Sequence, residues 1–257
     1  MAITINTNMA AARASFQLTK NNDALQKSLN RLSSGSRITK PADDAGGLAV
    51  AMKLKGSINR LKGVEANVGN AISFLQVQDG ILESSGKILD RMAELKALSQ
   101  DVLKNSSDIA NYNSEFRNLQ VQLHQMAATK FNGVSLFGGT EVFGSATTAS
   151  MKEIITSADG SVKVSINQSL LLSALTINTS DTTAPSLGSA AYASADNSTI
   201  YTFAATATSG AISLGAIDAA VYTKALENIA TLRSENGASV SRLQFAEEAA
   251  QQRRTNL

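Results

Sequence analysis

Side chains that could carry out chemistry are few in this sequence of 257 residues, and they are scattered along it. His124 is the only histidine and cysteine is absent. A multi-histidine metal site, a thiolate metal site and a cysteine nucleophile are therefore excluded. No His-Glu-x-x-His pattern is present either, and a single histidine in a helical pattern is expected on the surface of its helix. The sequence predicts no metal and no cofactor.

Asp43 and Asp44 form the one acidic pair that resembles an acid/base constellation. The pair follows Pro41 and precedes a long periodic apolar stretch, so it would lie at the positive end of a helix dipole. The Gly46-Gly47 that follows is not a phosphate-binding loop, because no Gly-Lys-Ser/Thr comes after it. We interpret the pair as a helix start and expect that the protein is not an enzyme.

The helix that this pair begins is the longest element expected, running from Asp43 to about Asn105. Apolar residues recur there at steps of three, four and seven, which places them on one face. At 1.5 Å per residue the helix would be roughly 90 Å long, too long for the core of a compact domain. It should therefore pack along other helices. The stripe comprises Leu54, Ile58, Leu61, Val68, Ile72, Leu75, Leu82, Leu89, Met92, Leu95 and Val102.

Three further helices are expected, at residues 7–32, from Asp108 to about Lys130, and from about Ala216 onward. Asn105 to Asp108 is a break followed by an N-cap, after which the chain should fold back antiparallel on the long helix. The stripe of this third helix comprises Ile109, Tyr112, Phe116, Leu119, Leu123 and Met126.

The region between the third and last helices is rich in Ser, Thr, Ala and Gly, and Asp159-Gly160 predicts a hairpin turn. A second short strand is expected at residues 199–203. The predicted fold is mainly α: a long antiparallel helical rod or coiled-coil bundle with a small β-hairpin-rich insert. The expected divisions are an N-terminal helix and connector at 1–42, the rod at 43–138, the insert at 139–212 and the rest of the rod at 213–257.

Composition excludes several classes of function. The formal charge is only +2 and no basic run interleaves with aromatics, so nucleic-acid binding has little support. No apolar run is long enough to insert into a membrane. The N-terminus lacks the pattern of a cleaved signal peptide. Taken alone, this predicts a cytosolic protein, unless export uses another route.

Several segments carry a family resemblance. The runs Leu-Ser-Ser-Gly-Ser-Arg-Ile at 32–38 and Asp-Asp-Ala-Gly-Gly-Leu-Ala at 43–49 resemble the N-terminal motif of bacterial flagellins. The opening at 5–8, the turn at 131–133, and Ala225, Arg233 and Gly237 in the last helix are similar too. The resemblance covers about residues 1–138 and 213–257.

This resemblance implies a secreted structural subunit that assembles with copies of itself into the flagellar filament. In the family, paired terminal helices form the inner wall of a tube, and the central segment faces outward. Export runs through the flagellum's own channel without a cleaved signal. The implied partners are the export apparatus, an export chaperone, and the hook-associated and cap proteins.

Flagellins continue beyond the point where this sequence stops, with a segment that pairs with the first helix. We therefore expect a fragment or a short paralogue in which the first helix exposes an apolar face at Phe16, Leu25 and Leu29.

The residues expected to matter for packing are Leu54, Ile58, Leu61, Val68, Ile72, Leu75, Phe116, Leu119 and Leu123, together with Gly35, Arg37, Asp43 and Asp44 of a signature loop spanning 35–44.

Arg91, Leu95 and Glu115 resemble positions at which some flagellins contact a Toll-like receptor of animals. Arg91 and Leu95 lie one turn apart. Flagellins that this receptor senses strongly usually have a glutamine at the position of Asp90. The competing interpretation is that Arg91, Leu95 and Glu115 make contacts between subunits of the filament.

Two alternatives remain open at this point. A hook–filament junction protein would share the rod-like helices, although the Asp-Asp-Ala-Gly-Gly-Leu run disfavours it. A binding module that displays its insert to a receptor or polysaccharide is the other, and the shortage of aromatics argues against it.

Overall fold

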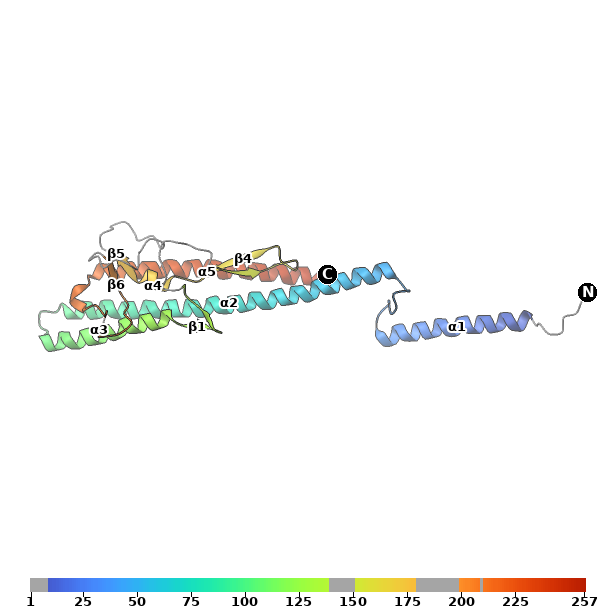
Figure 1. Ribbon diagram of the computed structural model, residues 1–257, viewed down its shortest axis with the longest axis horizontal. Helices are drawn as coiled ribbons and strands as arrows, with labels where there is room; N and C mark the ends of the chain where they lie inside the picture. Colours follow the sequence, from blue (N-terminus) through green and yellow to red (C-terminus); the bar gives the residue numbers. More distant parts are fainter. Residues whose placement is uncertain (1–8, 139–150, 179–198, 209) are drawn as a thin grey trace, which may run out of the picture. The chain divides into compact units, whose positions relative to one another are not determined.

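The computed structural model describes residues 9–138, 151–178, 199–208 and 210–257 (Figure 1). The chain falls into two compact units, residues 1–59 and 60–257. Each unit is described by itself below. One helix, α2 (Ala45–Ser99), contributes its first turns to the first unit and the rest to the second.

The first unit contains α1 (Met9–Ser34), a connecting loop and the start of α2. Gly35 has φ +65°, the left-handed conformation that ends a helix without strain only for glycine. At the other end of the loop, Asp44 Oδ1 accepts a hydrogen bond of 2.8 Å from the Gly47 N–H and so caps α2. The acidic pair therefore does begin a helix, as the sequence predicted.

In the second unit, α2, α3 (Ser106–Ala127) and α5 (Ala219–Thr255) lie side by side (Figure 1). α3 turns back on α2 after a capping box. The Asn105 side chain accepts from the Asp108 N–H at 2.8 Å, and the Asp108 carboxylate accepts from the Asn105 N–H at 3.3 Å. This confirms the predicted break and N-cap. α5 is also antiparallel to α2, since Arg233 pairs with Asp79 and Arg254 with Glu65.

α2 ends at Ser99, before the predicted limit near Asn105. The prediction that Val102 continues the apolar stripe is wrong, because Val102 lies beyond the helix and is 96% exposed. Residues 100–104 form a turn instead, in which the Lys104 N–H donates to the Asp101 carbonyl.

The remaining described elements include small antiparallel strand pairs. β1 (Lys130–Phe131) and β2 (Val134–Ser135) are joined by Asn132 and Gly133, whose φ angles of 48° and 79° suit a tight hairpin turn. β3 (Met151–Ile155) pairs with β4 (Lys163–Asn167) around the predicted turn at Asp159-Gly160. β5 (Thr176–Asn178) pairs with β6 (Thr199–Tyr201), and the short helices α4 (Leu171–Ala174) and η2 (Leu214–Ala216) complete the described elements. The predicted fold class, mainly α with small β-hairpins, is confirmed.

One hydrophobic core runs through the second unit. Stripes from α2, α3 and α5 meet in it, and side chains of β4, α4 and β5 extend it over α5. Phe116 of α3 meets Tyr222 of α5 edge-on, with ring centroids 6.3 Å apart. Burial along such stripes is what stabilises helices dotted with glycine.

Candidate subunit-packing surfaces

The apolar residues predicted for packing lie mostly inside the chain's own core. Leu61, Val68 and Leu75 of α2 are almost completely buried, and so are Phe116 and Leu123 of α3. Ile72 and Leu119 are partly buried against the same cluster. Leu54 and Ile58 belong to the first unit and are half-buried. In the second unit these side chains hold the helices of one chain together.

Polar residues interrupt this core at positions that sequence reasoning missed. Gln78, Ser85 and Lys96 of α2 are buried, although they fall on the apolar stripe. The heptad that runs through Leu75, Leu82 and Leu89 continues to Lys96, and Gln78 and Ser85 lie three residues after Leu75 and Leu82. A polar residue at a buried position needs a hydrogen-bond partner. The positions of these three residues on the apolar stripe are therefore the signal in the sequence that could have identified them.

Ser85 donates to the Ile81 carbonyl of its own helix at 2.9 Å, whereas Gln78 and Lys96 bind backbone groups of segments that cross the helices. Gln78 donates to the Leu136 carbonyl at 2.7 Å, and Lys96 donates to the Leu214 carbonyl at 3.0 Å. Gln120 of α3 holds both backbone groups of Ile212, donating to its carbonyl at 2.8 Å and accepting from its N–H at 3.0 Å. These bonds fix the chain where it leaves β2 and where it enters η2.

The signature loop is held by its two aspartates in different ways. Asp43 pairs with Lys27 of α1 at 2.5 Å and accepts hydrogen bonds from the Thr39 N–H and hydroxyl at 3.4 and 3.1 Å. The hydrogen bond from Lys27, supported by those from Thr39, holds the pKa of Asp43 well below its usual range. Asp44 caps α2 and lies 3.4 Å from Arg37. The structure thus brings Arg37, Asp43 and Asp44 together, with Gly35 at the start of the same loop.

The large apolar side chains of α1 are exposed. None of its residues is buried, and Phe16 is 68% exposed. The exposed large apolar side chains of α1 are Met9, Phe16, Leu18, Leu25, Leu29 and Leu32. The expected exposure of Phe16, Leu25 and Leu29 is therefore present in the first unit taken by itself.

The residues proposed for receptor contact separate into two environments. Arg91 forms a two-pronged ion pair with Glu115 of α3, at 2.8 and 3.2 Å, and also pairs with Glu94 at 2.7 Å. These carboxylates raise the pKa of Arg91 further above its already high usual value. Leu95 is completely buried in the core. Arg91 and Glu115 form an exposed surface, and Leu95 supports it from below.

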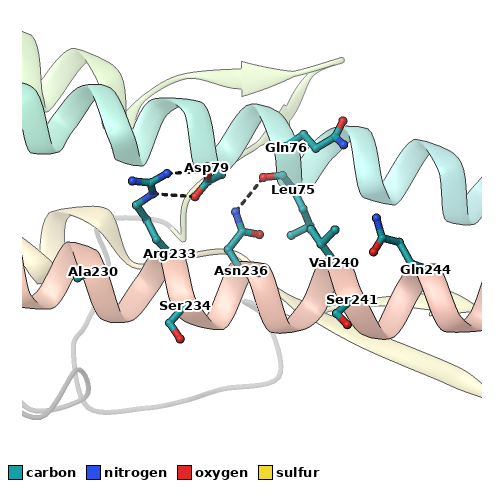
Figure 2. A pocket seen from close by; sticks show the side chains of 11 residues that line it. Leu75, Gln76, Asp79, Ala230, Arg233, Ser234, Asn236, Val240, Ser241 and Gln244 are labelled. Carbon is teal, nitrogen blue, oxygen red and sulfur yellow. Dashed lines mark hydrogen bonds and ion pairs between the residues drawn. The ribbon is translucent and has the colours of Figure 1, made fainter.

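A groove of about 690 Å³ opens between α2 and α5 (Figure 2). Arg233 crosses it to hold both oxygens of Asp79, at 2.9 and 3.1 Å. One turn further along α5, Asn236 donates to the Leu75 carbonyl at 2.8 Å. We call this the α2–α5 groove. Its lining residues are Leu75, Gln76, Asp79, Ala230, Arg233, Ser234, Asn236, Gly237, Val240, Ser241 and Gln244.

His124 is half-buried and stacks on Phe203, with ring centroids 6.0 Å apart, so the expectation of a surface histidine is only partly met. Across the described residues, no cluster of three or more His, Cys, Asp or Glu side chains could hold a metal ion. None of the described helices combines the length and apolarity needed to cross a membrane.

Comparison with known proteins gives a consistent result. A family model described as the bacterial flagellin N-terminal helical region matches residues 5–142. The flagellin of Bacillus subtilis is 33% identical over 168 residues, covering 63% of this chain and 55% of that protein. The flagellar filament 30.7 kDa core protein of Treponema maltophilum is 35% identical over 136 residues, covering 52% of this chain and 48% of that protein. The chain thus spans about half the length of these two relatives.

A crystal structure of Bacillus cereus flagellin is also similar, with a TM-score of 0.47 and 21% sequence identity, covering 72% of this chain and 88% of that one. The family match extends over α1, the signature loop, α2 and α3, which is more than half of the sequence. On that match, the chain belongs to the bacterial flagellin family.

Proposed function

We propose that this chain is the helical part of a subunit that assembles with copies of itself into the bacterial flagellar filament and so serves motility. The observation that carries the proposal is the family match over residues 5–142, which spans all the elements from α1 to the end of α3. The matched relative from Treponema maltophilum, named a filament core protein, supports it.

The assembly mechanism divides the apolar residues into two sets. The stripes of α2, α3 and α5 are buried inside the subunit, and the buried polar bonds make that part a defined block. The apolar side chains of α1 remain exposed. Covering each of them is worth roughly 1.5–3 kcal/mol, so helices of neighbouring subunits would be held strongly there. Head-to-tail contacts that do not close on themselves propagate a filament.

The subunit's partners and location follow from the resemblance. The subunit would leave the cell through the flagellum's own channel, without a cleaved signal peptide, and would add at the distal tip outside the cell. Its transient partners would be the export apparatus, an export chaperone, and the hook-associated and cap proteins. The absence of cysteine suits a protein that passes from a reducing to an oxidising space.

The test is deletion of the gene in the source bacterium and complementation with variants of the full-length protein. The wild type should restore filaments and swimming. The triple variant Phe16→Ser, Leu25→Ser, Leu29→Ser should be exported but remain unassembled, because α1 then has less apolar surface to bury against neighbouring subunits. The control, Val102→Ser with Leu103→Ser, changes two exposed apolar residues of the turn after α2 and should assemble normally. A deletion strain that keeps normal filaments, or a triple variant that assembles as well as the control, would contradict the proposal.

The position of the protein on the cell distinguishes the proposed filament subunit from two alternatives. Immunogold labelling along whole filaments is expected for a filament subunit. Labelling confined to the hook end would favour a hook–filament junction protein. Unpolymerised protein at the surface would favour a binding module.

Contact with an animal Toll-like receptor is a second candidate function. It is favoured by the exposed Arg91–Glu115 pair, which presents one cation and one carboxylate on neighbouring helices. Arg91→Ala should weaken receptor signalling in reporter cells, whereas Lys87→Ala, one turn away on α2, should not. Equal signalling by the wild type and Arg91→Ala would contradict this role and leave the filament contacts as the function of these residues.

A further inference from the structure

We infer that Asn132–Gly133, at the tip of the hairpin formed by β1 and β2, is a site of spontaneous deamidation. The sequence contains two Asn-Gly dipeptides, at 132–133 and 236–237. An asparagine followed by glycine is well suited to this reaction, because glycine has no side chain to hinder ring closure. The structure leaves the first dipeptide open to reaction and protects the second. The inference does not depend on the proposed function.

The reaction needs only water and the two residues themselves. The Gly133 nitrogen, after losing its proton to water, attacks Asn132 Cγ. A bond from this nitrogen to Cγ forms, the bond from Cγ to Nδ2 breaks, and ammonia leaves. Water then opens the resulting succinimide ring. Breaking the bond from the Gly133 nitrogen to Cγ gives aspartate, and breaking its bond to the main-chain carbonyl carbon of residue 132 gives isoaspartate. Both products carry a carboxylate that asparagine lacks.

Asn132 and Gly133 are both exposed, and they form the two-residue turn between Phe131 and Val134. In the described part of the chain, neither the Asn132 side-chain amide nor the Gly133 N–H has a hydrogen-bond partner. A Cβ atom placed on Gly133 would meet no other atom within 4 Å. The nucleophile and the group that it attacks are therefore both free.

The turn can reach the reactive geometry by a local motion. Ring closure requires the peptide between residues 132 and 133 to rotate out of the turn. β1 and β2 are two residues long each, so opening the tip of the hairpin breaks few hydrogen bonds. A two-stranded hairpin is only marginally stable by itself. The rest of the subunit need not unfold for the reaction to occur.

The second Asn-Gly dipeptide lies inside α5, where both reacting groups are engaged. Asn236 is 4% exposed, and its side-chain nitrogen donates to the Leu75 carbonyl at 2.8 Å. The Gly237 N–H belongs to the hydrogen-bond ladder of the helix. Ring closure there would require the loss of the bond to Leu75 and the unwinding of α5. The same dipeptide is therefore protected at this position.

The turn at Asp159–Gly160 shows that a tight turn alone does not leave the reacting groups free. An aspartate can close the same ring with loss of water. Here, however, the Gly160 N–H donates to the Ser157 carbonyl at 3.2 Å. The Asp159 carboxylate accepts from the Ser161 hydroxyl at 2.8 and 2.9 Å. The freedom of both groups is thus a property of the turn at 132–133 in particular.

The two products should affect the hairpin differently. Aspartate keeps the length of the backbone, so the pairing of Phe131 with Val134 can persist. Isoaspartate adds a carbon atom to the backbone, which disturbs a turn whose geometry depends on two residues of normal length. The hairpin packs on α2 through Phe131, whose ring meets that of Phe74 edge-on with centroids 6.0 Å apart. Isoaspartate should therefore loosen this contact.

Incubation of the folded, full-length protein at mildly alkaline pH, followed by tryptic digestion and mass spectrometry, tests the inference. Trypsin releases peptide 131–152, whose only side-chain amide is Asn132. It also releases peptide 234–242, whose only side-chain amide is Asn236. Deamidation raises the mass of either peptide by about 1 Da. The first peptide should gain this mass at least about tenfold faster than the second, because reaction at Asn236 needs local unfolding of α5.

The unfolded chain is the matched control. In guanidinium chloride the two dipeptides should react at similar rates, because the structure that distinguishes them is lost. Similar rates for the two peptides in the folded protein would overturn the inference. A difference that persists unchanged in the denaturant would overturn it too, since the protection of Asn236 would then not come from the fold.

Enzymatic methylation of isoaspartate tests which products form. An isoaspartyl methyltransferase should label peptide 131–152 from incubated protein but not from fresh protein. Freshly prepared Asn132→Asp supplies the aspartate product alone and should unfold at the wild-type midpoint in guanidinium chloride, whereas incubated protein should gain a fraction that unfolds at lower denaturant. Incubated protein that takes up no label in this peptide and unfolds as Asn132→Asp does would overturn the formation of isoaspartate at this turn.

Discussion

Asp43 and Asp44 are adjacent in the sequence but have different structural roles. Asp44 caps α2 through the Gly47 N–H, whereas Asp43 points to Lys27 and Thr39. The sequence predicted that the pair begins a helix, because two carboxylates before a long periodic stretch favour the dipole of that helix. Which carboxylate caps the helix depends on a lysine sixteen positions before Asp43, and local spacing carries no such information.

The first prediction concerns the titration of Asp43. Lys27→Gln should raise the pKa of Asp43 toward its ordinary value of 3.8, because the largest cause of its lowered pKa is the hydrogen bond from Lys27. The pKa of Asp43 in the folded protein lies below its pKa in the unfolded chain. The stabilisation from this carboxylate is therefore complete above the ordinary value and is lost as the pH falls through the folded value.

Carboxyl-resolved NMR titration would measure this shift. Lys20→Gln, which removes another lysine of α1, should leave the titration of Asp43 unchanged. A wild-type Asp43 that titrates at its ordinary pKa would contradict the ion pair.

At the scale of elements, buried side-chain bonds decide where the crossing segments attach. Gln120 is completely buried and holds both backbone groups of Ile212, and Asn113 accepts from the Leu214 N–H at 2.8 Å. Together with Lys96, these residues fix the segment that leads into α5.

The second prediction follows from this arrangement. Gln120→Leu should lower the free energy of unfolding by about 1–3 kcal/mol, because it leaves the backbone groups of Ile212 without partners. Gln122→Leu makes the same change at an exposed position of α3 and should stay within about 0.5 kcal/mol of the wild type. Denaturant unfolding of both variants is the measurement, and equal midpoints would show that the bonds to Ile212 add no stability.

The third prediction contrasts two glycines. Gly237→Ala should raise the free energy of unfolding of the monomer by about 0.5–1 kcal/mol, because alanine is the better helix former and nothing crowds its Cβ. At Gly47 the added Cβ would lie 2.8 Å from Asp44 Cγ. Gly47→Ala should therefore displace the helix cap.

Thermal melting of the monomer measures the first change, and amide exchange in the first turn of α2 measures the second. A Gly237→Ala variant that melts below the wild type would mean that this glycine serves the subunit fold after all.

The elements themselves were largely predictable, and their polar attachments were not. The steps of three, four and seven among residues such as Leu61, Val68 and Leu75 follow from helix geometry, and all three residues are buried. Asn132-Gly133 and Asp159-Gly160 predicted turns because they suit hairpins. The heptad indicates that Lys96 is buried, but the partners of Lys96 and Gln120 could not be predicted, since they lie 118 and 92 residues away and only the folded chain brings them together. The apolar stripe predicted from the spacing includes Leu95 and not Arg91, and in the structure Leu95 is buried whereas the Arg91 side chain is 43% exposed.

At the scale of the whole molecule, the family match explains why so few side chains suit chemistry. Flagellins are structural proteins, so the expectation that the chain is not an enzyme is confirmed by its family. The task proposed for such a chain is packing: inside the subunit along the stripes of α2, α3 and α5, and between subunits along α1. Disrupting a buried stripe should unfold the subunit, whereas replacing the exposed apolar residues of α1 should leave it folded and unassembled.

The central claim is that copies of this chain build the filament, and cryo-electron microscopy of filaments purified from the source bacterium tests it most directly. The account predicts a helical lattice in which every subunit contains α2, α3 and α5 with the side chains of this sequence, and in which the apolar face of α1 is covered by neighbouring subunits. Filaments whose density fits another sequence throughout, or subunits whose α1 side chains remain open to solvent, would contradict it.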